Sequence, residues 1–361
     1  MRKFAFAVCI LLLCSLAQSQ SLRNQGSGPH APVNQSELVA KLRSHMDELS
    51  RKDEFSGVVL LAKDGVPVFE QAYGLANREY NVPNNIETKF NLGSINKLFT
   101  RIAIGQLVIE GKVGLDDPMG KYLPDYPNKE AQKATIRQIA MMRSGIGDFF
   151  GAKFRDTPKD RIRTIADFMA LLAAEPLAFE PGTKEAYSNG GFVVLGAVIE
   201  KVSGQSYYDY VREHICKRLG MESTDFYEAD GMTSNLATGY TSQTEDDDHG
   251  PRRNNIYTRP ARGSSAGGGY STARDLLKLA NALEARKLTN PVFAPDVPKP
   301  ADMPFAALRG TGIAGGAPGI NADMESSLPG GYTVIVLSNY DPPSATKVAR
   351  QVREWMGLRE Y

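Results

Sequence analysis

The chain has 361 residues, of which 42% are hydrophobic and 23% charged, and this composition is typical of a globular protein that can bury a core. Its 42 lysine and arginine residues nearly equal its 41 acidic residues, so no basic excess points to nucleic acid and no acidic excess to a disordered partner segment. The four histidines are scattered without the spacing of zinc ligands, and we expect no metal and no cofactor.

The first 19 residues have the pattern of a signal peptide, in which Arg2 and Lys3 precede an apolar run that ends in small and polar residues. Leu13 before Cys14 is a poor match to a lipoprotein site, which favours a free product over a lipid anchor. Residues 20–35 are polar, contain glycine and proline, and are expected to form a flexible leader. No later stretch is apolar over the length of a membrane span. We therefore expect a secreted or periplasmic protein.

Hydrophobic periodicity predicts the elements that follow, in chain order. The pattern is helical at first, then that of a β-hairpin, then mainly helical through the middle of the chain. The expected segments are a helix over 36–52, a hairpin over 57–74 that turns at Asp64-Gly65, helices between 94 and 219, a polar loop over 241–263, a helix over 271–287, a strand over 332–340 and a helix over 344–357.

Strands at both ends and helices in the middle predict an α+β fold. We expect an antiparallel sheet, flanked by N- and C-terminal helices, in a domain built from residues 36–93 and 265–361. Residues 94–264 should form an inserted, mainly helical domain. The strand over 332–340 should pair with the early hairpin, and a cleft between two such domains is a common ligand site.

Two glycine-containing motifs are poor candidates for the chemistry. GSSAG, residues 263–267, matches G-x-S-x-G, but no buried strand precedes it and no histidine follows residue 249, so we interpret it as a loop before a helix. GTGIAG, residues 310–315, matches G-x-G-x-x-G, but GAPG follows directly and no helix can begin there, which argues against a dinucleotide site.

A third motif, NLGSINKLFT at residues 91–100, places Ser94 and Lys97 three apart where a helix begins. Residues three apart share one face of a helix. Ser94 is therefore either an N-cap with a solvated lysine downstream, or a nucleophile with its cationic partner. The spacing S-x-x-K alone does not decide, because Ser344 and Lys347 also match it at the expected N-cap of the last helix.

The wider context of Ser94 favours the nucleophile. FNLGSINKLFT resembles the active-site helix of the serine β-lactamase-like superfamily, which comprises penicillin-binding proteins, class C β-lactamases and related esterases and D-aminopeptidases. Further segments resemble that superfamily in the same order: TIRQIAMMRSGI from residue 135, FEPGTKEAYSNGGFVVLGAVIEKVSG from 179, SSAGGGYSTARDLLKLANAL from 264 and LPGGYTVIVLSNYD from 328. The resemblance runs from about residue 37 to residue 360.

The resemblance implies a hydrolase that works through an acyl-enzyme on Ser94 and needs no metal or cofactor. It puts Tyr187 and Asn189 at the Tyr and Asn positions of a Y-x-N motif. Either Lys97 or Tyr187 could take the proton from Ser94, since a free hydroxyl is a poor nucleophile near neutral pH. Asn189 would position Lys97 and the substrate carbonyl. Backbone N–H groups of Ser94 and of a strand residue would form the oxyanion hole.

One motif departs from the superfamily. Relatives carry K-T-G or H-x-G on the strand beside the site, whereas GIAGGAPG, residues 312–319, puts Ile313 at the Lys or His position. Gly315 and Gly316 remain, and Gly316 would still offer its backbone N–H. Because Ile313 offers no charge to a substrate carboxylate, it favours neutral acyl groups.

We therefore predict a secreted serine hydrolase that acts on a small-molecule ester, amide or peptide, with esterase activity ahead of β-lactamase activity. One alternative is a β-lactamase or a D-alanyl-D-alanine carboxypeptidase. Another is a catalytically impaired binding protein that keeps the cleft, which Ile313 favours mildly. The presence of Ser94, Lys97, Tyr187 and Asn189 together favours the enzyme. No nucleic-acid partner is expected, and the sequence predicts no particular oligomeric state.

Overall fold

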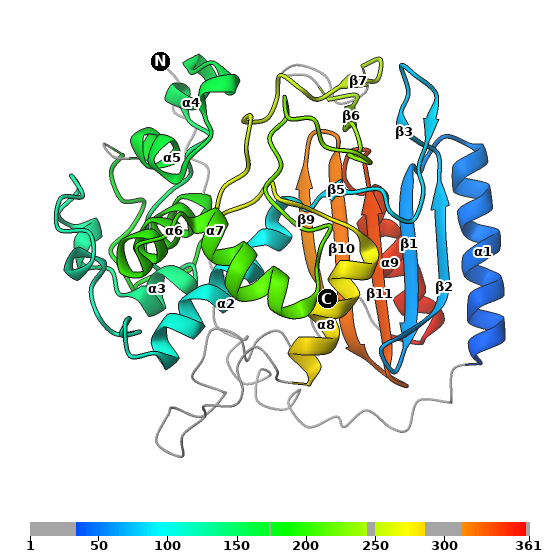
Figure 1. Ribbon diagram of the computed structural model, residues 1–361, viewed down its shortest axis with the longest axis horizontal. Coiled ribbons are helices and arrows are strands. Elements are labelled where there is room, and N and C mark those ends of the chain that lie inside the picture. The colour runs from blue at the N-terminus through cyan, green and yellow to red at the C-terminus, as the bar shows by residue number, and fades with distance from the viewer. Residues whose placement is uncertain (1–33, 173–174, 244–249, 286–311, 359–361) are drawn as a thin grey trace, which may run out of the picture. The chain divides into compact units, whose positions relative to one another are not determined.

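The computed structural model describes residues 34–172, 175–243, 250–285 and 312–358. The expected signal peptide and nearly all of the expected leader lie outside the described residues. From Asn34 onward the described residues form one compact unit, in which a sheet part and a helical part can be distinguished (Figure 1).

The sheet has five strands in the order β2-β1-β11-β10-β9, and every neighbouring pair is antiparallel. The predicted pairing of the last strand with the hairpin is present, with Val59 opposite Val336. The hairpin turns at Asp64 and Gly65, which both have positive φ, as the predicted Asp-Gly turn requires. The strands are β1 (Gly57–Lys63), β2 (Val66–Tyr73), β9 (Ile313–Ala317), β10 (Ile320–Leu328) and β11 (Tyr332–Ser338).

Helices cover both faces of the sheet, and the central strands β1 and β11 are accordingly apolar and buried along almost their whole length. Helices α1 (Gln35–Arg51) and α9 (Ser344–Trp355) lie on one face, and α8 (Ala273–Glu284) lies on the other (Figure 1). Asn34 is the N-cap of α1, and its side chain accepts a hydrogen bond from the N–H of Glu37. This architecture confirms the predicted fold class.

The last helix differs from its prediction at its first residue. Pro343 is the N-cap of α9, and Ser344 is the first helical residue. The Ser344 hydroxyl donates to Ser338 Oγ at the end of β11, 2.9 Å away. The prediction that Ser344 caps this helix is therefore wrong, because its hydroxyl bonds to the preceding strand.

The middle of the chain folds into helices that pack around α2 and α6. These two helices contact each other and are apolar around most of their circumference, as expected of helices inside a core. The main core cluster joins them to Val58 and Leu60 of β1, so the helical part and the sheet part share one core. The helices are α2 (Asn96–Ile109), α3 (Ile136–Ala140), α4 (Ala152–Asp156), α5 (Ile165–Leu172), α6 (Asn189–Ser203) and α7 (Tyr207–Val211).

Short strand pairs brace the connecting loops. One of them, β6 with β7, lies within or beside the segment that the sequence predicted as a long polar loop. The pairs are β3 (Leu75–Asn77) with β4 (Val82–Pro83), β5 (Phe90–Asn91) with β8 (Tyr270–Ser271), and β6 (Tyr240–Thr241) with β7 (Arg253–Asn254).

The segment that precedes α2 packs directly against the edge strand β9. It forms a 3₁₀ turn, η2 (Gly93–Ile95). A Cβ on Gly315 would lie 2.0 Å from the carbonyl oxygen of Leu92, and a Cβ on Gly93, whose φ is +49°, would lie 2.8 Å from the backbone N of Gly316. Only glycine fits at these two positions, and the close approach places the backbone of β9 beside Ser94.

Candidate active site

Ser94 lies in η2, immediately before α2. Its side chain caps neither element. Instead, Ser94 Oγ lies 2.5 Å from Tyr187 Oη and 3.1 Å from Lys97 Nζ. The interpretation of Ser94 as an N-cap with a solvated lysine is therefore wrong.

Lys97 is buried, with only 5% of its surface exposed, although lysine side chains usually reach solvent. Its Nζ has three oxygen neighbours: Asn189 Oδ1 at 2.6 Å, the carbonyl oxygen of Ala266 at 2.6 Å and Ser94 Oγ at 3.1 Å. Burial lowers the pKa of Lys97 to about 7, and the Asp148 carboxylate opposes this shift. A substantial fraction of Lys97 is therefore a free amine at neutral pH.

The tripeptide Tyr-Ser-Asn at residues 187–189 leads into α6. Ser188 is the N-cap, and its side chain accepts from the N–H of Gly191. Tyr187 and Asn189 flank this cap and reach Ser94 and Lys97 respectively. Loss of solvent around the hydroxyl raises the pKa of Tyr187, although the residue as a whole is 57% exposed. Tyr187 therefore keeps its proton at neutral pH.

Asp148 also belongs to this cluster and was not predicted from the sequence. Asn189 Nδ2 donates to Asp148 Oδ2 at 2.6 Å, which leaves Asn189 Oδ1 to face Lys97. The other carboxylate oxygen, Oδ1, accepts from the N–H of Phe150 at 3.2 Å. A signal for this residue was present, because Asp148 lies two residues after the TIRQIAMMRSGI segment that resembles the superfamily.

The GSSAG loop also lies at the site, but not as a nucleophile elbow. Ala266 contributes its backbone carbonyl to Lys97, and the carbonyl of Ser265 accepts from Thr100 Oγ1 at 2.6 Å. The Ser265 hydroxyl is buried and has no hydrogen-bond partner among the described residues. Ser265 therefore lacks an adjacent base, which agrees with the interpretation of this segment as a loop.

Ser94 opens into a cavity of about 430 Å³ between the helical part and β9. This volume suits a small-molecule ligand. Glycine, apolar and aromatic residues make up most of the lining, together with the polar groups of Ser94, Tyr187 and Asn189. Arg259 is the one charged side chain among the described residues that line the cavity.

Strand β9 contributes backbone rather than long side chains to this cavity. Gly316 and Ala317 line it, and a Cβ on Gly315 would lie 2.8 Å from the backbone N of Ser94. Ile313 lies at the other end of β9, opposite Met324, and its partly buried side chain packs against the main core. The structure thus brings Gly315 and Gly316 to Ser94, whereas Ile313 is not among the described residues that line the cavity.

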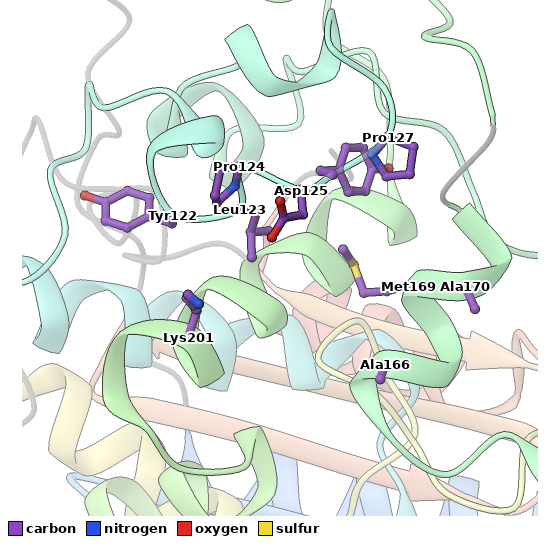
Figure 2. Close-up of a pocket in the computed structure, with 10 residues that line it drawn as sticks. Tyr122, Leu123, Pro124, Asp125, Pro127, Ala166, Met169, Ala170 and Lys201 are labelled. Atoms are coloured by element: carbon purple, nitrogen blue, oxygen red, sulfur yellow. The ribbon is translucent and has the colours of Figure 1, made fainter.

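A second hollow, of about 390 Å³, lies elsewhere in the helical part (Figure 2). The loop over 122–127, helix α5 and Lys201 of α6 form its walls. It shares no lining residue with the Ser94 cavity and contains no serine, cysteine or histidine. It therefore offers no comparable nucleophile.

The described ranges lack both a cluster of metal-ligating side chains and a membrane-spanning helix. No group of three or more His, Cys, Asp or Glu side chains in these ranges is placed to hold a metal ion. No helix in the described part of the chain is both long and apolar enough to cross a membrane.

The chain is similar to several known proteins. A family model described as Beta-lactamase matches residues 42–354. Penicillin-binding protein 4* of Bacillus subtilis (strain 168) is 33% identical over 188 residues, which are 52% of this chain and only 41% of that relative's length. Esterase EstB of Burkholderia gladioli is 28% identical over 294 residues, 72% of each chain. The solved structure of a penicillin binding protein from Bacillus halodurans is 30% identical, with a TM-score of 0.75, over 86% of this chain and 98% of that one.

Proposed function

Because the chain belongs to the beta-lactamase family, we propose that it is a serine hydrolase that cleaves an ester or amide through an acyl-enzyme on Ser94. The cluster of Ser94, Lys97 and Tyr187 beside the cavity carries this proposal. A hydroxyl within hydrogen-bonding reach of both a basic amine and a second proton donor is the arrangement that covalent catalysis needs.

The neighbours of Lys97 favour it, rather than Tyr187, as the base. The oxygens of Asn189 and Ala266 belong to carbonyl groups, which only accept hydrogen bonds. A neutral amine donates its two N–H groups to these oxygens and directs its lone pair at Ser94 Oγ. The pKa of Lys97, about 7, supplies the neutral amine at physiological pH.

The reaction then proceeds in two halves. Ser94 Oγ attacks the substrate carbonyl carbon while its proton passes to Lys97 Nζ. Tyr187 gives its proton to the departing oxygen or nitrogen and regains one from Lys97. The developing oxyanion accepts from the N–H groups of Ser94 and Gly316, which the packing of η2 on β9 brings close together. In the second half a water molecule attacks the acyl carbon and loses its proton to Lys97. The bond from the acyl carbon to Ser94 Oγ then breaks, Lys97 returns the proton to Ser94 Oγ, and the acid leaves.

Esters are the preferred substrates over β-lactams in this proposal. Strand β9 turns no charged side chain toward the cavity among the described residues, so a substrate carboxylate finds no cation on this strand. Desolvating an unpaired carboxylate is costly. The similarity to an esterase over 72% of both chains also supports this preference.

Arg259 favours a second candidate, a β-lactamase or D-alanyl-D-alanine carboxypeptidase. Its guanidinium lies 5.9 Å from the centre of the Tyr270 ring, and no ion pair joins it to another described residue. A free guanidinium in a cavity is a natural partner for a carboxylate.

Comparing kcat/KM for p-nitrophenyl butyrate and for nitrocefin separates the two candidates. We expect faster turnover of the ester. Faster turnover of nitrocefin, lost in Arg259→Gln, would support the second candidate instead. Turnover of neither substrate would favour the impaired binding protein.

Export to the periplasm or the medium is also part of the proposal. Its support is the signal-peptide pattern of residues 1–19 in the sequence.

A further inference from the structure

Three phenylalanine side chains, Phe149, Phe150 and Phe168, line the Ser94 cavity, and together we call them the aromatic wall. The Phe149 and Phe150 ring centres are 4.3 Å apart, and Phe168 packs edge-on against Phe149 at 5.1 Å. Phe154 contacts both Phe149 and Phe150 and extends the stack beyond the cavity lining. The wall is therefore one packed surface rather than three separate rings.

One ring of this wall is not covered by the protein. Phe149 and Phe168 are 5% and 1% exposed, but Phe150 is 49% exposed. This ring keeps apolar surface in water at the cavity, where a ligand can cover it and gain free energy.

The loop that carries Phe149 and Phe150 is bonded to the start of α6, where Asn189, the partner of Lys97, lies. Ser188 Oγ and the Gly190 N–H both donate to the carbonyl oxygen of Gly147, one residue before Asp148. Asp148 itself joins the loop to Asn189, the partner of Lys97. These bonds fix the loop. A substrate group that packs on Phe150 therefore loses little binding free energy to the ordering of this loop.

Apart from Arg259, the remaining lining within the described part of the chain carries no charged side chain and suits an uncharged ring. Pro260, Pro318 and Ile320 add apolar surface to the same cavity, and no carboxylate is present among its described lining residues. Aromatic pairs also gain from edge-to-face and offset packing beyond the area that they bury. We infer that the substrate carries an aromatic acyl group, such as phenylacetyl, which packs against Phe150 while its carbonyl carbon meets Ser94. This inference rests on the proposed function and specifies the acyl half of its substrate.

The test compares p-nitrophenyl phenylacetate with p-nitrophenyl acetate on the full chain. The two esters share a leaving group, so the ratio of their kcat/KM values reports the acyl subsite. We expect a ratio of about ten in favour of phenylacetate, and a three- to tenfold fall in this ratio, roughly, in Phe150→Ala. Phe150→Tyr should keep the ratio. The control Tyr80→Ala removes an aromatic side chain that is 81% exposed and outside the cavity lining, and should also keep it.

The outcomes separate this inference from the proposed function. A wild-type ratio near one, or a ratio that Phe150→Ala leaves unchanged, would overturn the aromatic subsite while the acyl-enzyme stands. An equal loss on both esters in Phe150→Ala would overturn it too, because the variant would then act through a displaced loop. Failure of the wild-type chain to hydrolyse either ester, with no adduct on Ser94, would overturn the proposed function itself.

Discussion

The pKa of Lys97 lies far below that of an ordinary lysine. A lysine in water has a pKa of about 10.4, whereas burial lowers the pKa of Lys97 to about 7. The Asp148 carboxylate opposes that shift, since a nearby negative charge favours the ammonium form. Asp148 therefore raises the pH below which Lys97 becomes protonated.

Replacing Asp148 by asparagine should move the acid limb of the kcat/KM pH profile to lower pH. The substitution removes the charge and keeps an oxygen that can accept from Asn189. The pKa of Lys97 then falls, and the free amine persists to lower pH. Asp125→Asn, in the second hollow, is the matched control and should leave the limb in place. An acid limb that stays still or moves to higher pH in Asp148→Asn would contradict Lys97 as the base.

The site residues differ in how visible they are in the sequence. Ser94, Lys97, Tyr187 and Asn189 stand in short motifs with fixed spacing, and the structure brings them together as predicted. Ala266 was not predictable in this way, because it acts through a backbone carbonyl that any residue would provide.

At the scale of elements, the contact between η2 and β9 positions the N–H groups that we propose for the oxyanion hole. Gly315→Ala should lower both the melting temperature and kcat, because the added Cβ would lie 2.0 Å from the Leu92 carbonyl oxygen and force the two segments apart. Overpacking of this kind costs about 1–3 kcal/mol. Thermal unfolding and ester kinetics measure the two effects. In the control Gly151→Ala the added Cβ meets no atom within 4 Å, so a loss as large there would contradict this account.

Strand β10 carries a carboxyl group that should destabilise the fold at neutral pH. Asp323 is 6% exposed, and its Oδ1 has no hydrogen-bond partner among the described residues. Burial raises the pKa of Asp323 well above its usual value; Glu325 adds to the shift and Arg353 opposes it. The folded state thus holds this proton to higher pH than the unfolded state, whose pKa is about 3.9, and stability falls as pH rises through that window.

Asp323→Asn should therefore stabilise the protein, by about 1–3 kcal/mol at pH 8, and by less as the pH approaches 4. Urea unfolding of both proteins at several pH values measures the difference. A variant that is less stable than wild type at pH 8, or a difference that does not change with pH, would refute this assignment.

Elements differed in how well the sequence predicted them. The hairpin and the last strand are runs of β-branched and aliphatic residues around an Asp-Gly turn, and both were predicted. Strand β9 reads IAGGA, and its glycines give almost no strand signal on their own. Those glycines allow the close approach of β9 to η2. The same residues that the site requires therefore weaken the strand pattern in the sequence.

For the whole molecule, the order of patterns was enough to predict the architecture. Strands were expected near both ends of the chain, which predicted one sheet that contains strands from each end. The pairing of β1 with β11 confirms this sheet. A division into domains at residue 94 was harder to judge from sequence, because one core continues from β1 into α2 and α6.

Removal of the signal peptide is a prediction for the whole chain. On expression in a bacterium with a Sec pathway, the protein should appear in the periplasm or medium without its first 17 to 19 residues or so. Intact-mass measurement of the exported protein identifies the new N-terminus. Recovery of the unprocessed chain from the cytosol alone would contradict the signal peptide.

Covalent labelling of the nucleophile tests the central claim most directly. The full chain is treated with a fluorophosphonate probe, and the adduct is located by mass spectrometry of its peptides. We predict a single adduct on Ser94, and no labelling of Ser94→Ala that retains the wild-type circular dichroism spectrum. An adduct on Ser265 or Ser344, or labelling that persists in Ser94→Ala, would contradict the assignment of Ser94 as the nucleophile.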